Sequence, residues 1–172
     1  VNLYAQWSAG SYTVTYNSNK PTTASGSVSG TTANSTHVYD TAKNLTKNGY
    51  SLTGWTFKNW NTKADGSGTS YADQASVKNL ATSGTVTLYA QWTANTYTIV
   101  YNGNKPANAS GTISGTTPSS THTFDVAAKL TKNGYSLTGW NFRGWNTRPD
   151  GNGTSFTDES VVTNLTSVSG GT

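Results

Sequence analysis

The chain is built from two copies of one module, and this repetition constrains its fold more than any other feature. Residues 4–80 and 89–165 align without a gap at an offset of 85 residues, with 48 identical positions in 77. A fixed internal period of this size is typical of tandem structural units. The repeat predicts two domains, residues 1–92 and residues 93–172, although 172 residues would suit one domain on length alone.

Aromatic residues are expected to supply much of each core. A module of about 85 residues buries only a little over ~60% of the surface of its unfolded chain. Leu, Ile and Val are sparse, but the chain has 6 Trp, 10 Tyr and 4 Phe. Each buried aromatic side chain hides about 150–250 Å². Two small cores rich in aromatic residues are therefore expected.

Composition argues against several classes of function. The net charge is +4, but the 11 Lys and Arg are scattered, so we expect no nucleic-acid partner. The chain has no Cys, which excludes disulfides, thiolate metal sites and Cys nucleophiles. No apolar run reaches the length of a membrane span, so we expect no membrane insertion.

Alternating apolar residues predict two strands at the junction of the modules. Val86–Trp92 reads V-T-L-Y-A-Q-W, and Val1–Trp7 reads V-N-L-Y-A-Q-W. This period of two is typical of a half-buried strand. A second strand is expected around Tyr12, Val14 and Tyr16, with its twin 85 residues later.

A short helix is expected in each module. Asp40 has the character of an N-cap, Thr41–Lys47 could form about two turns, and Gly49 stands where a left-handed cap residue belongs. The second copy repeats the pattern, with Asp125 before V-A-A-K-L-T-K-N and Gly134 after it. With further strands at 50–53 and 55–60, the element order predicts an α+β, mostly β, module with the β-grasp (ubiquitin-like) topology.

Three strings resemble a known family. They are G-W-x-x-x-x-W-N-T-x-x-D-G-x-G-T-S from Gly54, L-Y-A-Q-W from Leu88 and Y-T-V-T-Y-N from Tyr12. Together they resemble the Listeria–Bacteroides repeat, whose best-known member is the B repeat of internalin. The resemblance implies β-grasp-like modules in tandem on extracellular bacterial surface proteins, without enzymatic activity. The L-T-K-N-G-Y segment before Ser51 departs from the usual Pro-Thr-x-x-Gly-Tyr, so only fold and role are carried over.

The polar residues that repeat in both copies are best explained by structural roles. Asp65-Gly-Ser-Gly lacks the ligand spacing and the closing Glu of a calcium loop, and it fits a tight turn. His37 and His122 occur once per module, with no partner residue for metal binding or catalysis. Asp40, Asp65 and Asp73 fall at caps and turns. We therefore expect no catalytic residues, no metal site and no cofactor.

Aromatic side chains provide the alternative hypothesis of ligand binding. Trp55 and Trp60 are expected in the core, although flat aromatic faces also suit sugar rings. Tyr4 and Tyr89 lie on the opposite strand face from Trp7 and Trp92, so they are the candidate ligand contacts.

Two hypotheses of function follow. The first is a non-enzymatic stalk or spacer segment of a bacterial surface adhesin, whose partners are neighbouring repeats of the same protein. The alternative is a module that binds glycans of the wall or the host, or host proteins. A polysaccharide-processing enzyme ranks third.

The two ends of the chain predict strand exchange. If V-x-L-Y-A-Q-W is the last strand of each repeat, Val1–Trp7 belongs to a preceding repeat, and the second copy ends at 169–172 without its own last strand. Val1–Trp7 of one molecule is then expected to insert into the second copy of another. The alternative is that each repeat begins with this strand, so that both copies are complete and monomeric.

Overall fold

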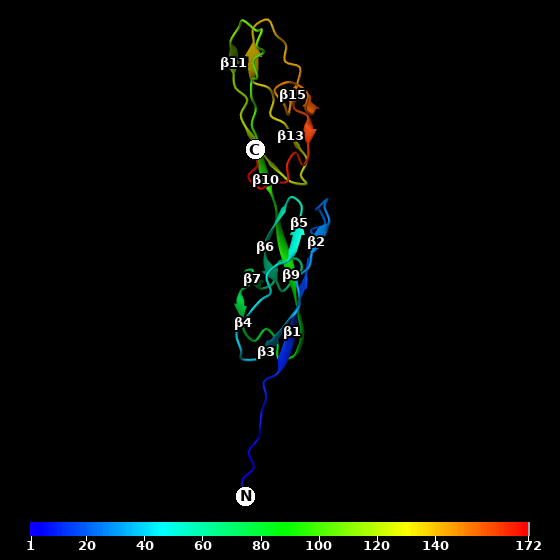
Figure 1. Ribbon diagram of the computed structural model, residues 1–172, viewed down its shortest axis with the longest axis vertical. Helices are drawn as coiled ribbons and strands as arrows, with labels where there is room; N and C mark the ends of the chain where they lie inside the picture. The colour runs from blue at the N-terminus through cyan, green and yellow to red at the C-terminus, as the bar shows by residue number, and fades with distance from the viewer. Residues whose placement is uncertain (172) are drawn as a thin grey trace. The chain divides into compact units, whose positions relative to one another are not determined.

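The chain folds into two compact units made of β-strands and turns. The computed structural model describes residues 1–171 and divides the chain into Val1–Thr93 and Ala94–Thr172 (Figure 1). No helix forms within residues 1–171. Each unit is described by itself below.

The first unit contains one large sheet and one separate two-stranded sheet. Its strands are β1 (Ser11–Asn17), β2 (Val28–Gly30), β3 (Ser35–Val38), β4 (Lys43–Asn44), β5 (Tyr50–Leu52), β6 (Trp55–Asn61), β7 (Ser70–Tyr71), β8 (Ser76–Val77) and β9 (Gly84–Ala94). Seven strands form one sheet in the order β2-β5-β6-β9-β1-β3, with β7 paired to β6. The remaining two, β4 and β8, pair with each other.

The longest strand, β9, lies inside this sheet between β6 and β1. It runs parallel to β1, with six registered pairs from Tyr12 opposite Gly84 to Asn17 opposite Tyr89. A parallel pair needs a long crossover connection, and here the whole of β2 to β8 supplies it. The alternation that predicts a strand at Val86–Trp92 is thus realised in β9.

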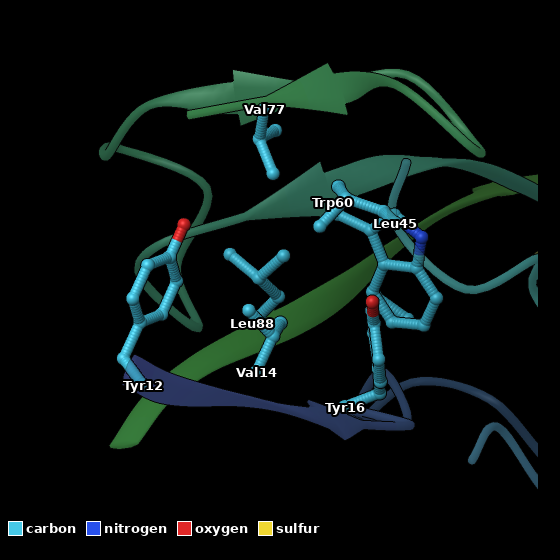
Figure 2. Close-up of a cluster of buried hydrophobic side chains, with 8 residues drawn as sticks. Tyr12, Val14, Tyr16, Leu45, Trp60, Val77 and Leu88 are labelled. Atoms are coloured by element: carbon cyan, nitrogen blue, oxygen red, sulfur yellow. The ribbon is translucent and has the colours of Figure 1, made fainter. Parts of the chain in front are cut away.

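The core of the first unit packs β1, β6 and β9 against the β4–β8 pair. Figure 2 shows Tyr12, Val14 and Tyr16 projecting from one face of β1 toward the other core side chains. The remaining buried members are Leu45, Trp60, Val77, Leu88 and Ala90. The rings of Tyr16 and Trp60 meet at 4.8 Å between centroids, so aromatic contacts fill much of this core.

The expected helix at Thr41–Lys47 does not exist, and the α+β, β-grasp prediction is wrong. Asp40 adopts φ +65°, a left-handed conformation, instead of the extended backbone of an N-cap. The backbone amide of Asp40 donates to Asn79 Oδ1 at 2.6 Å, and the side-chain Nδ2 of Asn79 donates back to Asp40 Oδ1 at 2.8 Å. This reciprocal pair ties the segment to a distant part of the chain.

After Asp40 the chain is extended, because it pairs with β8. Lys43 and Asn44 pair with Val77 and Ser76, and the Leu45 amide donates to the Ala75 carbonyl at 2.9 Å. The pairing places the Leu45 side chain in the core. Gly49 is no left-handed cap either: its Cα faces the Thr31 carbonyl so closely that a Cβ would overlap it.

The second unit repeats this departure from the expected helix. Asp125 has φ +59°, its amide donates to Asn164, and Ala128–Lys129 pair with Val161–Val162. The V-A-A-K-L-T-K-N segment is therefore extended and carries Leu130 into the core.

The strands of the second unit form several small sheets in place of one large sheet. Its strands are β10 (Thr96–Ile99), β11 (Ile113–Gly115), β12 (Ser120–Thr123), β13 (Ala128–Lys129), β14 (Tyr135–Leu137), β15 (Trp145–Asn146), β16 (Ser155–Phe156) and β17 (Val161–Val162). They form four separate two-stranded sheets: β10-β12, β11-β14, β13-β17 and β15-β16. Its buried cluster has only Tyr101, Leu130 and Val162, with four partly buried residues against it.

The absence of a central strand accounts for this division. In the first unit β9 joins β1 to β6. Within residues 94–171 no strand lies between their counterparts, β10 and β15. Accordingly β15 has two residues where β6 has seven.

The N-terminal V-N-L-Y-A-Q-W segment takes no part in either sheet. Residues 1–10 form no strand, and Figure 1 shows this segment running away from β1. Leu3 and Trp7 are 94% and 93% exposed.

Candidate functional site

The histidines are buried structural residues. The His37 ring lies in β3, stacks on Tyr12 at 5.3 Å between centroids and has its Nε2 at 2.9 Å from Ser35 Oγ. His122 repeats this arrangement with Tyr97 and Ser120. Burial, and secondarily the charge of Lys43, lowers the pKa of His37 below 6.5. Such a neutral, enclosed ring is suited to packing.

The Asp65 loop is a turn organised by a neighbouring amide. Asp65 Oδ1 accepts hydrogen bonds from the amide and the hydroxyl of Ser67, and the backbone bond is the main cause of the lowered pKa of Asp65. The buried Asn61 holds the other side of the turn, since its Nδ2 donates to the carbonyls of Gly66 and Gly68. The side chains of this turn therefore satisfy one another.

Among residues 1–171 no group of three or more His, Cys, Asp or Glu side chains could hold a metal ion. The recurrent acids serve local structure: Asp73 accepts the Asn48 amide at 2.7 Å, and Asp40 pairs with Asn79.

The aromatic candidates occupy different surroundings. Trp60 is fully buried in the first core, and Trp55 is half-buried in β6. Tyr89 lies half-buried in β9, on the face opposite to Leu88 and Ala90. Tyr4 is 78% exposed on the N-terminal segment. The fold thus does not bring Tyr4 and Tyr89 into a common pocket, and the role of each as a ligand contact stays a prediction.

The most distinctive arrangement in the first unit is the parallel pair of β1 and β9. The chain enters this unit through β1 and leaves it through β9, and the two strands are neighbours with the same direction. Side chains support the pair: Thr15 Oγ1 and Thr87 Oγ1 lie 3.1 Å apart, and Trp92 Nε1 donates to the Ser18 carbonyl at 2.8 Å. Only Asn95 separates β9 from β10.

Comparison with known proteins identifies the family. The sequence model of the Listeria–Bacteroides repeat domain matches residues 12–91 and 97–168. This chain belongs to the Listeria–Bacteroides repeat family. The first match begins in β1 and ends in β9, so V-T-L-Y-A-Q-W closes the matched repeat.

A relative and the absence of structural matches complete the comparison. The chain is 37% identical over 107 residues to a protein of Evansella cellulosilytica named "Putative Gly-rich membrane protein". The match covers 60% of this chain but only 12% of that protein. No solved structure matches the chain. Among the described residues, no helix could cross a membrane.

Sequence reasoning found the strands of this arrangement but missed their direction and the links that fix them. The alternation at Tyr12–Tyr16 and Val86–Trp92 gave no sign that the two strands run parallel. The reciprocal Asp40–Asn79 pair joins residues 39 positions apart. Its only sequence signal is the recurrence of Asp and Asn at the same places in both copies.

Proposed function

We propose that this chain is a non-enzymatic stalk segment of a bacterial surface protein, in which the tandem repeats bear load and hold another part of the protein at a distance. Membership of a repeat family and the close similarity of the two copies support this role, because spacing needs repetition of one unit and no active site. The name of the Evansella relative, a membrane protein, agrees with a location at the cell envelope.

The observation that carries the proposal is the parallel pairing of β1 with β9. A stalk is pulled through the chain, so force enters at the start of β1 and leaves at the end of β9. In a parallel pair this force slides one strand along the other and loads all six registered pairs together. An antiparallel terminal pair would instead open one bond at a time. The first unit is therefore built to resist stretching along its chain.

Force spectroscopy with two attachment geometries tests this. The chain has no Cys, so introduced cysteines are unique handles. Ser8→Cys with Thr93→Cys pulls β1 and β9 in shear, whereas Ser18→Cys with Thr93→Cys pulls the adjacent ends of the same two strands apart. We expect the first pair to unfold at a force several times higher. Complete extension between residues 8 and 93 should release ~300 Å of chain.

The two variants control for each other, because both keep the same fold, and their handles differ in one position only. Equal chemical stability, measured by urea unfolding, would show that neither pair of cysteines weakens the unit. Equal unfolding forces in the two geometries would remove the mechanical argument for a stalk.

A further inference from the structure

A hollow in the first unit lies where β9 extends beyond the end of β1. The registered pairs of these two parallel strands stop at Asn17 and Tyr89, and β9 continues through the next residues to Ala94. The loop that follows β1 lies beside this extension, and the hollow between them has a volume of about 380 Å³. Its lining includes Lys20, Thr22, Thr23, Trp55, Ala90 and Trp92. We call it the tryptophan hollow.

Hydrogen bonds hold the wall of the tryptophan hollow in place. Asn19 has φ +43°, and its Nδ2 donates to the carbonyls of Ala64 and Ala90 at 2.8 and 2.9 Å. From the other side, Trp92 Nε1 donates to the Ser18 carbonyl at 2.8 Å. The loop is therefore tied both to β9 and to the turn after β6. A hollow that is formed in advance loses little entropy when a ligand binds.

Two tryptophan side chains give the hollow its apolar surface. Trp55 of β6 and Trp92 of β9 are both half-buried, and Figure 1 shows these strands as neighbours. The Trp92 ring is held edge to face by Phe57, at 5.9 Å between centroids and 84° between planes. Ala90, which is fully buried, contributes only a methyl group to the lining. Large flat side chains thus surround a position with a small one.

The rim of the hollow is polar and carries a positive charge. Lys20, Thr22 and Thr23 are exposed on the loop. The ammonium group of Lys20 offers three donors, and each threonine hydroxyl both donates and accepts. Among the described residues that line the hollow, Lys20 is the one with a charged side chain. The electrostatics of the rim therefore favour an anionic ligand.

A sugar ring combines the two kinds of surface that this hollow offers. The C–H groups on the face of a pyranose are electron-poor, whereas the face of an aromatic ring is electron-rich. The hydroxyls around the edge of the sugar need polar partners at the rim. Small-molecule sites have volumes of about 300–1,000 Å³, so a hollow of about 380 Å³ suits a single ring better than a protein surface.

We propose that the tryptophan hollow binds one pyranose ring of an acidic polysaccharide. The C–H face of the ring would lie against Trp55 and Trp92, and its hydroxyls would bond to Thr22 and Thr23. The carboxylate of a uronic acid would pair with Lys20. This binding function goes beyond the stalk role and does not depend on it. The force measurements can fail while the hollow binds sugar, and the reverse also holds.

Isothermal titration calorimetry of the 172-residue chain tests the proposal. The probes are hexasaccharides of galacturonate, of alginate and of hyaluronan, each compared with its methyl ester, which keeps the ring but removes the charge. We expect at least one uronate to bind, and its ester to bind about two- to fivefold more weakly, as for an exposed ion pair. Binding of none of the three would overturn the proposal. Equal affinities of acid and ester would overturn the pairing with Lys20.

Two variants with one matched control assign the contacts. Lys20→Gln should remove the difference between acid and ester. Lys58→Gln, the control, removes an exposed charge from the opposite face of β6 to Phe57 and should keep that difference. Trp55→Ala should weaken binding of both probes at least about tenfold. Urea unfolding of each variant shows whether the first unit remains folded. Unchanged affinity in Trp55→Ala would contradict the stacking.

The chain without substitutions gives a second measurement. During the titration, the indole N–H signals of Trp55 and Trp92 should shift in the NMR spectrum. The Trp60 signal should move much less, because that side chain is fully buried in the core. Shifts confined to other tryptophans would place the sugar elsewhere and overturn the assignment of this hollow.

Discussion

The side-chain amide of Asn61 determines the geometry of the turn that follows β6. Its Nδ2 donates to the carbonyls of Gly66 and Gly68 and to Ser70 Oγ, and its Oδ1 accepts the amides of Lys63 and Gly68. The side chain is 1% exposed, so water cannot replace these bonds. This explains why Asn follows Trp in both copies of the W-N-T string.

Asn61→Asp is predicted to destabilise the first unit by about 2–4 kcal/mol, because the new oxygen would face carbonyl oxygens and lose all three donated bonds. The measurement is urea unfolding at pH 7. Asn146→Asp is the matched control: Asn146 makes the same bonds but is half-exposed, so its loss should be smaller. A larger loss at Asn146 would contradict this explanation.

The buried histidines predict that stability depends on pH. Burial lowers the pKa of both His37 and His122 from 6.5 in the folded chain, so the folded state binds fewer protons than the unfolded state. Their contribution to stability is complete above pH 6.5 and is lost as the pH falls from 6.5 through the folded pKa. We expect the melting temperature to fall over this window.

Thermal unfolding at steps between pH 7.5 and pH 4.5 measures this fall. The double variant His37→Gln, His122→Gln should have a lower melting temperature at pH 7.5 but a flatter profile down to pH 5. Asp65, whose pKa is lowered from 3.8, acts only at lower pH and does not interfere. An unchanged slope in the double variant would exclude the histidines as the cause.

At the scale of elements, local sequence predicts the long strands well and the short ones poorly. The alternation in β1 and β9 records which face is buried, and both strands form where it appears. In contrast, Asp40, Ala42, Leu45 and Gly49 together suggest a capped helix, yet the segment is extended. Its conformation depends on Ser76–Val77 and Asn79, more than 30 residues away, and no local pattern contains that information.

Local sequence also does not contain the long-range pairing that forms the candidate site. The V-x-L-Y-A-Q-W alternation was enough to predict the strand β9, but not its parallel pairing with β1. Trp55 and Trp140 are the same residue at corresponding positions, yet Trp55 is half-buried in β6 and Trp140 is 44% exposed. The environment of a residue can thus differ between copies that share their sequence.

Close approach of β2 and β5 explains the glycines before each Tyr-Ser-Leu strand. A Cβ on Gly49 would overlap the Thr31 carbonyl oxygen, and its amide donates to Thr32 Oγ1 at 2.9 Å. Gly49→Ala should therefore destabilise the first unit by about 3 kcal/mol, because backbone has to move. Gly26→Ala is the control, since its Cβ would meet Leu52 Cδ1 at an ordinary 3.6 Å. Urea unfolding of both variants measures the difference; equal losses would refute the steric explanation.

At the scale of the whole chain, two copies that share 48 of 77 aligned positions have unequal cores. The first unit buries Leu88 and Ala90 of β9 among the side chains of β1 and β6, while the second has no such strand within the described residues. Apolar burial is the main source of stability in domains this small. The second unit should therefore be the less stable of the two.

Calorimetry of the chain should show two transitions, the lower from the second unit. Two matched substitutions assign them. Leu45→Ala and Leu130→Ala each remove a core leucine, at 2% and 4% exposure, and each should cost about 2–5 kcal/mol. Leu45→Ala should lower only the upper transition and Leu130→Ala only the lower. If Leu130→Ala moves the upper transition, or one cooperative transition contains both units, the ranking of the two cores is wrong.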